Sequence, residues 1–237
     1  MTIYLTELSP ECVNFPSPFD ALDEPNGLLA FGGDLQPERI LYAYQHGIFP
    51  WYGPNEPILW WSPAPRAVFK PMTYKPAKSV KKFQRKTQFL VSINKDADSV
   101  IDFCASTRTQ EETWLNQDMR TAYKTLHKQG YVHSVEVWHD STLVGGLYGV
   151  LIGSLFCGES MFSLESNASK IGLWFFCHHF AANGGRLIDC QVINPHLKSL
   201  GATEMSRERF LSTLTICKNE QVTSSCFSAQ WLTQPED

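Results

Sequence analysis

The sequence predicts an α+β protein: a small N-terminal α/β domain over residues 1–65, and a larger domain over residues 66–237 with a mixed, mainly antiparallel sheet. Two observations carry this prediction. The first 65 residues are rich in Pro and Gly turn signals, and only residues 37–45 show a helical pattern. From residue 66 onward, strand-period and helix-period segments follow one another along the chain.

The N-terminal segment is dominated by turns and aromatic residues. The helix at 37–45 has Pro at its first turn and Gly47 after its end, as helix starts and stops require. Two proline-stiffened aromatic segments follow, at residues 47–54 and 58–65. Such segments either cap a core or form a platform on which a base can stack.

The larger domain begins with alternating strands and helices. Strands are expected at residues 67–70, 88–93, 132–138 and 142–153, and helices at residues 79–86, 97–106 and 117–129. The last two strands form a hairpin. A strand–helix–strand unit follows at residues 154–162, 167–183 and 186–192, and its helix is apolar on nearly all sides, which predicts burial. Helices at 195–200 and 207–217 complete the chain, and the last twenty residues are expected to be peripheral.

Three polar side chains stand inside apolar strands of that unit. Side chains alternate along a strand, so Asp189 and Gln191 should share one face, and Glu159 should share a face with Cys157 and Met161. Burying such groups is costly unless they are paired or used. The pattern therefore indicates either a satisfied buried network or an active site.

Composition and charge narrow the class of protein. The chain has 237 residues, 43% of them apolar, and a net charge of −4. Seven cysteines without a CxxC pair argue against a disulfide framework or a zinc site and favour a reducing compartment. No signal peptide is visible and the most apolar helix is too short for a bilayer, so we expect a cytoplasmic protein without a membrane partner.

Basic residues are concentrated in one window. Between Glu56 and Asp96 there are nine basic residues and no acidic one. Such a window indicates a surface for a phosphate backbone, although a solvated face is the commoner meaning of a charge run. The candidate residues lie on the helix expected at 79–86 and just before it: Lys78, Lys81, Lys82, Arg85 and Lys86.

Antiparallel strands followed by strand–helix–strand are the layout of GNAT-type acyltransferases. Members that use acyl-CoA bind its pyrophosphate at a glycine-rich loop that opens the central helix. The corresponding turn here, residues 162–170, has no glycine and contains an acid. An acyl-CoA acetyltransferase is therefore an alternative that this turn disfavours.

Several motifs together resemble one family. They are Phe15-Pro-Ser-Pro, Glu24-Pro-Asn-Gly-Leu-Leu-Ala, Gly32-Gly-Asp-Leu, Gly47-Ile-Phe-Pro-Trp51, Trp60-Trp-Ser-Pro, Ser134-Val-Glu-Val-Trp, Val144-Gly-Gly-Leu-Tyr-Gly-Val, Gly158-Glu-Ser-Met-Phe-Ser and Leu187-Ile-Asp-Cys-Gln. In this order and spacing, they resemble the bacterial leucyl/phenylalanyl-tRNA–protein transferases. The resemblance implies a GNAT-like catalytic domain that moves Leu or Phe from aminoacyl-tRNA to the α-amino group of proteins beginning with Arg or Lys. These proteins are thereby marked for degradation in the N-end rule pathway. The resemblance implies no metal or other cofactor, and we expect a monomer.

The resemblance also implies roles for residues. Asp189 and Gln191 would hold the acceptor amine and deprotonate it, and whether they act as a base or only orient the amine stays open. Glu159 would hold the amino group of the aminoacyl ester. Trp51 and Trp114 would contact the terminal adenosine, and the basic helix would hold the acceptor stem. The aminoacyl pocket would be lined by Leu147, Met161, Leu173, Phe176 and Phe180.

Two further alternatives remain. A non-catalytic RNA-binding module explains the basic window and the tryptophans, but it leaves the polar strand residues without a purpose. A nucleophilic Cys190 is disfavoured because no histidine has a clear pairing with it.

Overall fold

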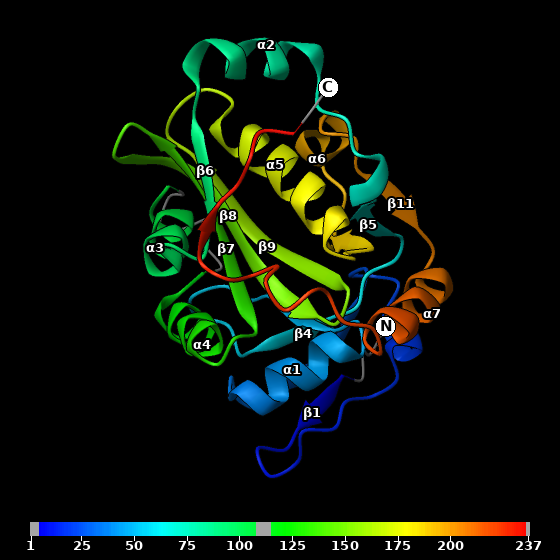
Figure 1. Ribbon diagram of the computed structural model, residues 1–237. Coiled ribbons are helices and arrows are strands. Elements are labelled where there is room, and N and C mark those ends of the chain that lie inside the picture. The colour runs from blue at the N-terminus through cyan, green and yellow to red at the C-terminus, as the bar shows by residue number, and fades with distance from the viewer. Residues whose placement is uncertain (1–4, 108–114, 236–237) are drawn as a thin grey trace.

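Two sheets organise the molecule in the computed structural model, which describes residues 5–107 and 115–235 (Figure 1). The smaller sheet has four strands in the order β1-β2-β4-β3, and the larger has eight in the order β11-β5-β10-β9-β8-β7-β6-β12. With helices on both faces of the large sheet, the α+β class predicted from the sequence is confirmed.

The smaller sheet comes from the first 61 residues. Its strands are β1 (Thr6–Leu8), β2 (Leu28–Gly32), β3 (Phe49–Pro50) and β4 (Leu59–Trp61). The helix α1 (Pro37–Gln45) lies between β2 and β3 and has the predicted bounds. The sequence analysis did not predict these strands, because two to five residues among turns carry too little periodicity to be recognised.

The larger sheet is antiparallel except at one pair. Its strands are β5 (Arg66–Phe69), β6 (Leu90–Ile93), β7 (Val132–His139), β8 (Thr142–Ile152), β9 (Leu155–Ser163), β10 (Leu187–Asp189), β11 (Thr203–Met205) and β12 (Gln230–Trp231). β9 and β10 are parallel neighbours, joined through α5 (Ala168–Ala182). The predicted hairpin and strand–helix–strand unit are thus confirmed.

Helices cover both faces of the large sheet, and each face has its own core. On one face, α3 (Ala97–Ser106) and α4 (Gln117–Lys128) share a core with α1 and the small sheet. On the other, α5 and α2 (Lys78–Thr87) share a core with the C-terminal segment. The prediction that α5 is buried is confirmed, since ten of its residues are buried. The remaining helices are α6 (Pro195–Ser199) and α7 (Arg207–Cys217).

The C-terminal segment is part of the core, so the expectation of a peripheral tail is wrong. Cys226 is fully buried, and the Phe227 ring lies between 6.1 and 6.2 Å from those of Phe156, Phe176 and Phe180. β12 then pairs with the edge strand β6. A few apolar residues in a polar tail were enough to dock it, and composition alone did not reveal them.

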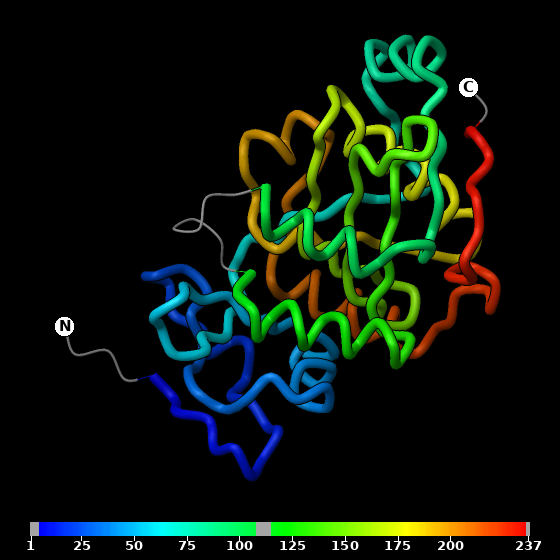
Figure 2. Tube along the Cα trace, turned by 90° about the vertical axis from the view of Figure 1, so that its left-hand side faces the viewer, coloured from blue at the N-terminus to red at the C-terminus, as the bar shows by residue number. Residues whose placement is uncertain are grey.

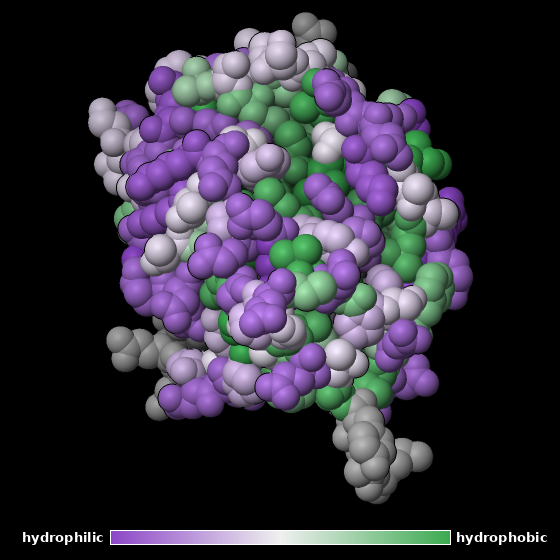
Figure 3. All heavy atoms as spheres, turned by 90° about the horizontal axis from the view of Figure 1, so that it is seen from below, coloured by the Kyte–Doolittle hydropathy of each residue, from purple (hydrophilic) through white to green (hydrophobic). Residues whose placement is uncertain are grey.

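The two ends of the molecule differ. In both Figure 1 and Figure 2, α2 lies at the end of the molecule opposite to the N-terminal sheet. Figure 3 views the molecule from below, from the end where the N-terminal sheet lies. This end is largely covered by hydrophilic side chains, with hydrophobic ones between them. None of the helices in the described part of the chain is long and apolar enough to cross a membrane.

Candidate active site

A cavity of about 360 Å³ opens between α5, the ends of β9 and β10, and the segment that follows β3. Its volume is in the range of small-molecule sites. The wall is mainly apolar, and its polar side chains include Glu159, Ser160, Gln191 and Asn194. An apolar chamber with a polar edge can hold an apolar side chain and orient a reactive group beside it.

Glu159 reaches the cavity because β9 has a bulge. Tyr148 pairs with Ser160 and Gly149 pairs with Gly158, so Glu159 is the extra residue. A Cβ atom on Gly149 would lie 2.2 Å from the carbonyl oxygen of Cys157, and only glycine allows this close approach. The bulge also puts Cys157 and Met161 in different cores, so the prediction that both share a face with Glu159 is wrong.

Gln191 reaches the same rim by leaving the strand. β10 ends at Asp189, and Gln191 adopts a left-handed conformation with φ of 58°. Its backbone N–H donates to Asp189 Oδ1 at 2.9 Å, as in an Asx-turn, which stabilises this conformation. The prediction that Asp189 and Gln191 share a strand face is therefore wrong, because regular alternation stops between them.

Asp189 is fully buried and does not line the cavity in the described part of the chain. Its two carboxylate oxygens accept from Arg66 Nε and Nη2, both at 2.8 Å. Burial alone would lower the pKa of Arg66, but the Asp189 charge offsets this and the pKa is raised. Arg66 belonged to the basic window in the sequence, but it is buried and forms an internal ion pair.

A chain of hydrogen bonds runs from Gln191 into the protein. Gln191 Nε2 donates to Glu159 Oε1 at 3.1 Å, and Tyr123 Oη donates to Glu159 Oε2 at 2.8 Å. The Tyr44 hydroxyl lies 2.8 Å from that of Tyr123 and donates to it, because the Tyr123 proton is already used. Burial raises the pKa of Glu159 to about 7, while the tyrosine hydrogen bonds lower it.

The structure brings four of the five predicted pocket residues together. Leu147, Met161, Leu173 and Phe176 line the cavity. Phe180 does not, since it lies behind Phe176 with the ring centroids 5.2 Å apart. Helical spacing placed all three α5 residues on one side of the helix, but it could not tell which would reach the cavity.

The predicted tryptophans have different outcomes. Trp51 lines the cavity and is 48% exposed, and its ring packs edge-on against Trp61. Trp61 Nε1 donates to the Trp51 carbonyl at 2.6 Å, which fixes this exposed ring at the rim. Trp114 lies outside the described residues.

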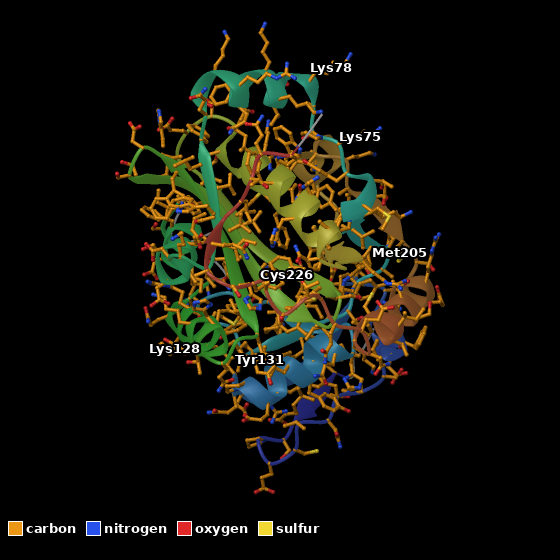
Figure 4. All side chains as sticks on the ribbon, in the orientation of Figure 1. Lys75, Lys78, Lys128, Tyr131, Met205 and Cys226 are labelled. Carbon is orange, nitrogen blue, oxygen red and sulfur yellow. The ribbon has the colours of Figure 1, made fainter. Side chains whose placement is uncertain are left out.

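The predicted basic residues lie on α2, away from the cavity wall in the described part of the chain. Lys78, Lys82, Arg85 and Lys86 are exposed, whereas Lys81 is half-buried with its Nζ 5.7 Å from the Trp174 ring centroid. Figure 4 shows the Lys78 side chain at this outer end. α2 therefore presents a basic outer face.

Sequence reasoning missed several residues of the site. Tyr44 and Tyr123 were hidden among ordinary core positions of α1 and α4. Cys190, which the sequence analysis considered as a nucleophile, does line the cavity, but burial raises the pKa of its thiol well above the usual value. A raised thiol pKa disfavours the thiolate, so it gives no support to a nucleophilic role.

These observations describe a chamber for an apolar side chain beside a carboxylate and an amide suited to holding amines. Residues 68–215 match the model of the leucyl/phenylalanyl-tRNA protein transferase family, and residues 33–64 match that of the family's N-terminal domain. The chain is therefore an enzyme of the aminoacyltransferase class, and it belongs to the leucyl/phenylalanyl-tRNA protein transferase family.

Curated relatives agree over nearly the whole chain. A leucyl/phenylalanyl-tRNA–protein transferase of Vibrio cholerae is 66% identical over 99% of this chain and 97% of its own length. One from Vibrio atlanticus is 65% identical over 98% of each chain. Among solved structures, a conserved protein of unknown function from Bacteroides thetaiotaomicron is 10% identical, with a TM-score of 0.40 over 66% of this chain and 55% of its own.

Proposed function

We propose that this enzyme moves Leu or Phe from aminoacyl-tRNA to the α-amino group of proteins that begin with Arg or Lys, and so marks them for degradation by the N-end rule. The observation that carries the proposal is the cavity, whose apolar chamber ends at Glu159 and Gln191. Leu147, Met161, Leu173 and Phe176 would surround the aminoacyl side chain. None of these wall residues is β-branched, and the flexible Met161 can adapt to either Leu or Phe.

The two polar groups at the rim would hold the reacting amines. A carboxylate attracts an ammonium group, and an amide oxygen accepts an N–H without adding a second charge. Because the amide nitrogen of Gln191 faces Glu159, its oxygen is the atom left to accept from an incoming amine. Glu159 and Gln191 are therefore the groups that we assign to touch the reactants.

We assign proton removal to Glu159, which lines the cavity, rather than to Asp189, which is fully buried, paired with Arg66 and absent from the cavity wall in the described part of the chain. An ammonium with a pKa of roughly 8 can pass its proton to a carboxylate whose pKa is about 7 with little uphill cost. The amine nitrogen then attacks the ester carbonyl, the bond to the ribose oxygen breaks, and this oxygen takes the second amine proton. Asp189 would not touch the reactants and would act by fixing the turn that carries Gln191.

Trp51 would stack on the terminal adenosine, and Trp114 is assigned the same role from the family resemblance. The exposed basic residues of α2 would bind the acceptor stem through its phosphates, largely without reading sequence. We also propose that the enzyme acts as a monomer in the cytoplasm, where aminoacyl-tRNA is made. We further propose that residues 1–65 and 66–237 form the two domains of the enzyme.

The test uses purified protein, radiolabelled Leu-tRNA and a model protein that begins with Arg, beside a control that begins with Ala. Label should enter only the Arg-first protein. If tRNA binds and no label moves, the protein is an RNA-binding module instead. If neither occurs, a thermal-shift measurement with acyl-CoA tests the acetyltransferase alternative.

A further inference from the structure

Arg66 has more contacts than a simple ion pair requires. Besides its two bonds to Asp189, its Nη1 donates to the Gly47 carbonyl oxygen at 2.9 Å. Its Cζ lies 4.4 Å from the ring centroid of Phe210 and 5.0 Å from that of Phe49. Two aromatic rings and three hydrogen bonds leave this guanidinium one orientation.

One side of Arg66 supports the turn that carries Gln191. Asp189 Oδ1 accepts from Arg66 Nε and also from the backbone N–H of Gln191. The next residue of β5, Ala67, donates its N–H to the Gln191 carbonyl at 3.0 Å. The left-handed backbone of Gln191 is thus held from β5 by a side chain and by the main chain.

The other contacts of Arg66 support a second part of the cavity wall. Gly47 and Phe49 belong to the segment that continues into Pro50 and Trp51, both of which line the cavity. Gly47 has φ of 76°, and a Cβ there would lie 2.6 Å from Leu211 Cδ2, so this segment is tightly fitted against α7. Arg66 therefore connects a segment of the small sheet with a turn of the large sheet.

We infer that Arg66 is a positioning residue: through Asp189 and Gly47 it fixes the distance between the Gln191 amide and the Trp51 wall. Arg66 itself is absent from the cavity wall in the described part of the chain, so it acts on the reaction only through these neighbours. The inference rests on the proposed function. A lysine could not replace it, because one ammonium group cannot match both carboxylate oxygens and a carbonyl in this planar arrangement.

The test compares Arg66→Lys with Arg39→Lys. Arg39 is also fully buried, donates to the Cys12 and Ser9 carbonyls and pairs with Asp34, but none of these partners lines the cavity. Arg66→Lys should lower kcat for transfer at least about tenfold with KM for Leu-tRNA within about twofold of wild type. Arg39→Lys should leave both values within about twofold.

A second variant separates positioning from folding. Arg66→Met combined with Asp189→Leu removes both charges, so no buried charge is left unpaired. It should melt near the wild-type temperature while kcat falls at least as far as in Arg66→Lys. Unfolding of both Arg66 variants would overturn the inference and give the pair a structural role only.

The pH profile gives a further readout. If Arg66 acts by geometry, kcat of Arg66→Lys falls at every pH and the midpoint of the profile stays that of wild type. A displaced midpoint would mean that the substitution acts on the protonation of Glu159 rather than on geometry, and it would overturn the inference. Wild-type kcat in Arg66→Lys would do the same. Absence of transfer by the wild-type protein would instead refute the proposed function, and the inference with it.

Discussion

The amide nitrogen of Gln191 donates to the carboxylate of Glu159 across 3.1 Å, although 32 positions separate the two residues in the chain. Two irregularities make this contact: the bulge that turns Glu159 toward the cavity, and the left-handed residue that brings Gln191 back over it. Because the amide nitrogen is held by Glu159, the amide oxygen is the end left for the cavity.

Gln191→Met keeps the length of the side chain but removes the amide oxygen that would orient the acceptor amine. Transfer should fall about 100-fold while tRNA binding is unchanged, because a misplaced amine costs about this much. The measurement is the rate of label transfer beside a tRNA-binding assay. Gln88→Met is the matched control, since Gln88 is also left-handed, with φ of 52°, and lies away from the cavity. Equal losses of transfer in both variants would mean that the effect comes from the backbone. That result would contradict the role assigned to the Gln191 amide.

Glu159→Gln should change the pH dependence of stability. The pKa of Glu159 is raised from its ordinary value of 4.5 to about 7. The folded state therefore binds this proton more tightly than the unfolded state does, and wild type loses stability as pH rises from about 4.5 to about 7. Gln has no such proton, so the variant should become more stable than wild type as pH rises. The difference in the free energy of unfolding should stay below about 3 kcal/mol, because the carboxylate is partly open to the cavity.

The measurement is thermal unfolding of both proteins between pH 5 and pH 8. The difference in Tm should widen, by a few degrees for each kcal/mol in a chain of this size, up to about pH 7 and then stay level. Parallel curves across this range would show that burial does not perturb Glu159.

Phe176→Leu and Phe180→Leu make the same change on the same helix, but only Phe176 lines the cavity in the described part of the chain. Phe176→Leu enlarges the chamber, so the ratio of kcat/KM for Phe-tRNA to that for Leu-tRNA should rise severalfold. Each variant should cost about 1–2 kcal/mol of stability. If Phe180→Leu changes the ratio as much, the assignment of the chamber is wrong.

Lys82→Ala combined with Lys86→Ala should weaken tRNA binding and lower its dependence on salt by about one power per lysine. The transfer rate at saturating tRNA should stay near that of wild type, because α2 is remote from the cavity. Lys128→Ala is the control: Lys128 is also exposed on a helix, but α4 lies away from α2 (Figure 4). A loss of affinity in Lys128→Ala of the same size would mean that the charge effect is not specific to α2.

Regular periodicity predicted most of the large sheet and its helices. The bounds of α1, α3 and α7 agree with those predicted from the sequence, and β7, β8 and α5 agree within two residues. The site was predicted less well, because it is built from departures from periodicity. A bulge at Glu159 and a left-handed Gln191 depend on pairing with distant strands, and no local pattern encodes them.

Contacts between residues far apart in the sequence were not predicted either. Arg66 begins one apolar strand and Asp189 ends another, which is a possible sign of a buried pair, but a strand order was needed to see that β5 and β10 are neighbours. The aromatic and basic residues were found because composition alone marks them. Their surroundings, such as the position of Lys81 against Trp174, came only with the fold.

The central claim is that Glu159 takes the proton of the acceptor amine, and the direct measurement is the pH dependence of single-turnover transfer from pre-bound Leu-tRNA to an Arg-first peptide. In wild type, the rate should rise with a midpoint near 7, the pKa of Glu159. In Glu159→Gln, the reaction should be slower and its midpoint should move to roughly 8, the pKa of an α-amino group. The same midpoint in both proteins would contradict the claim.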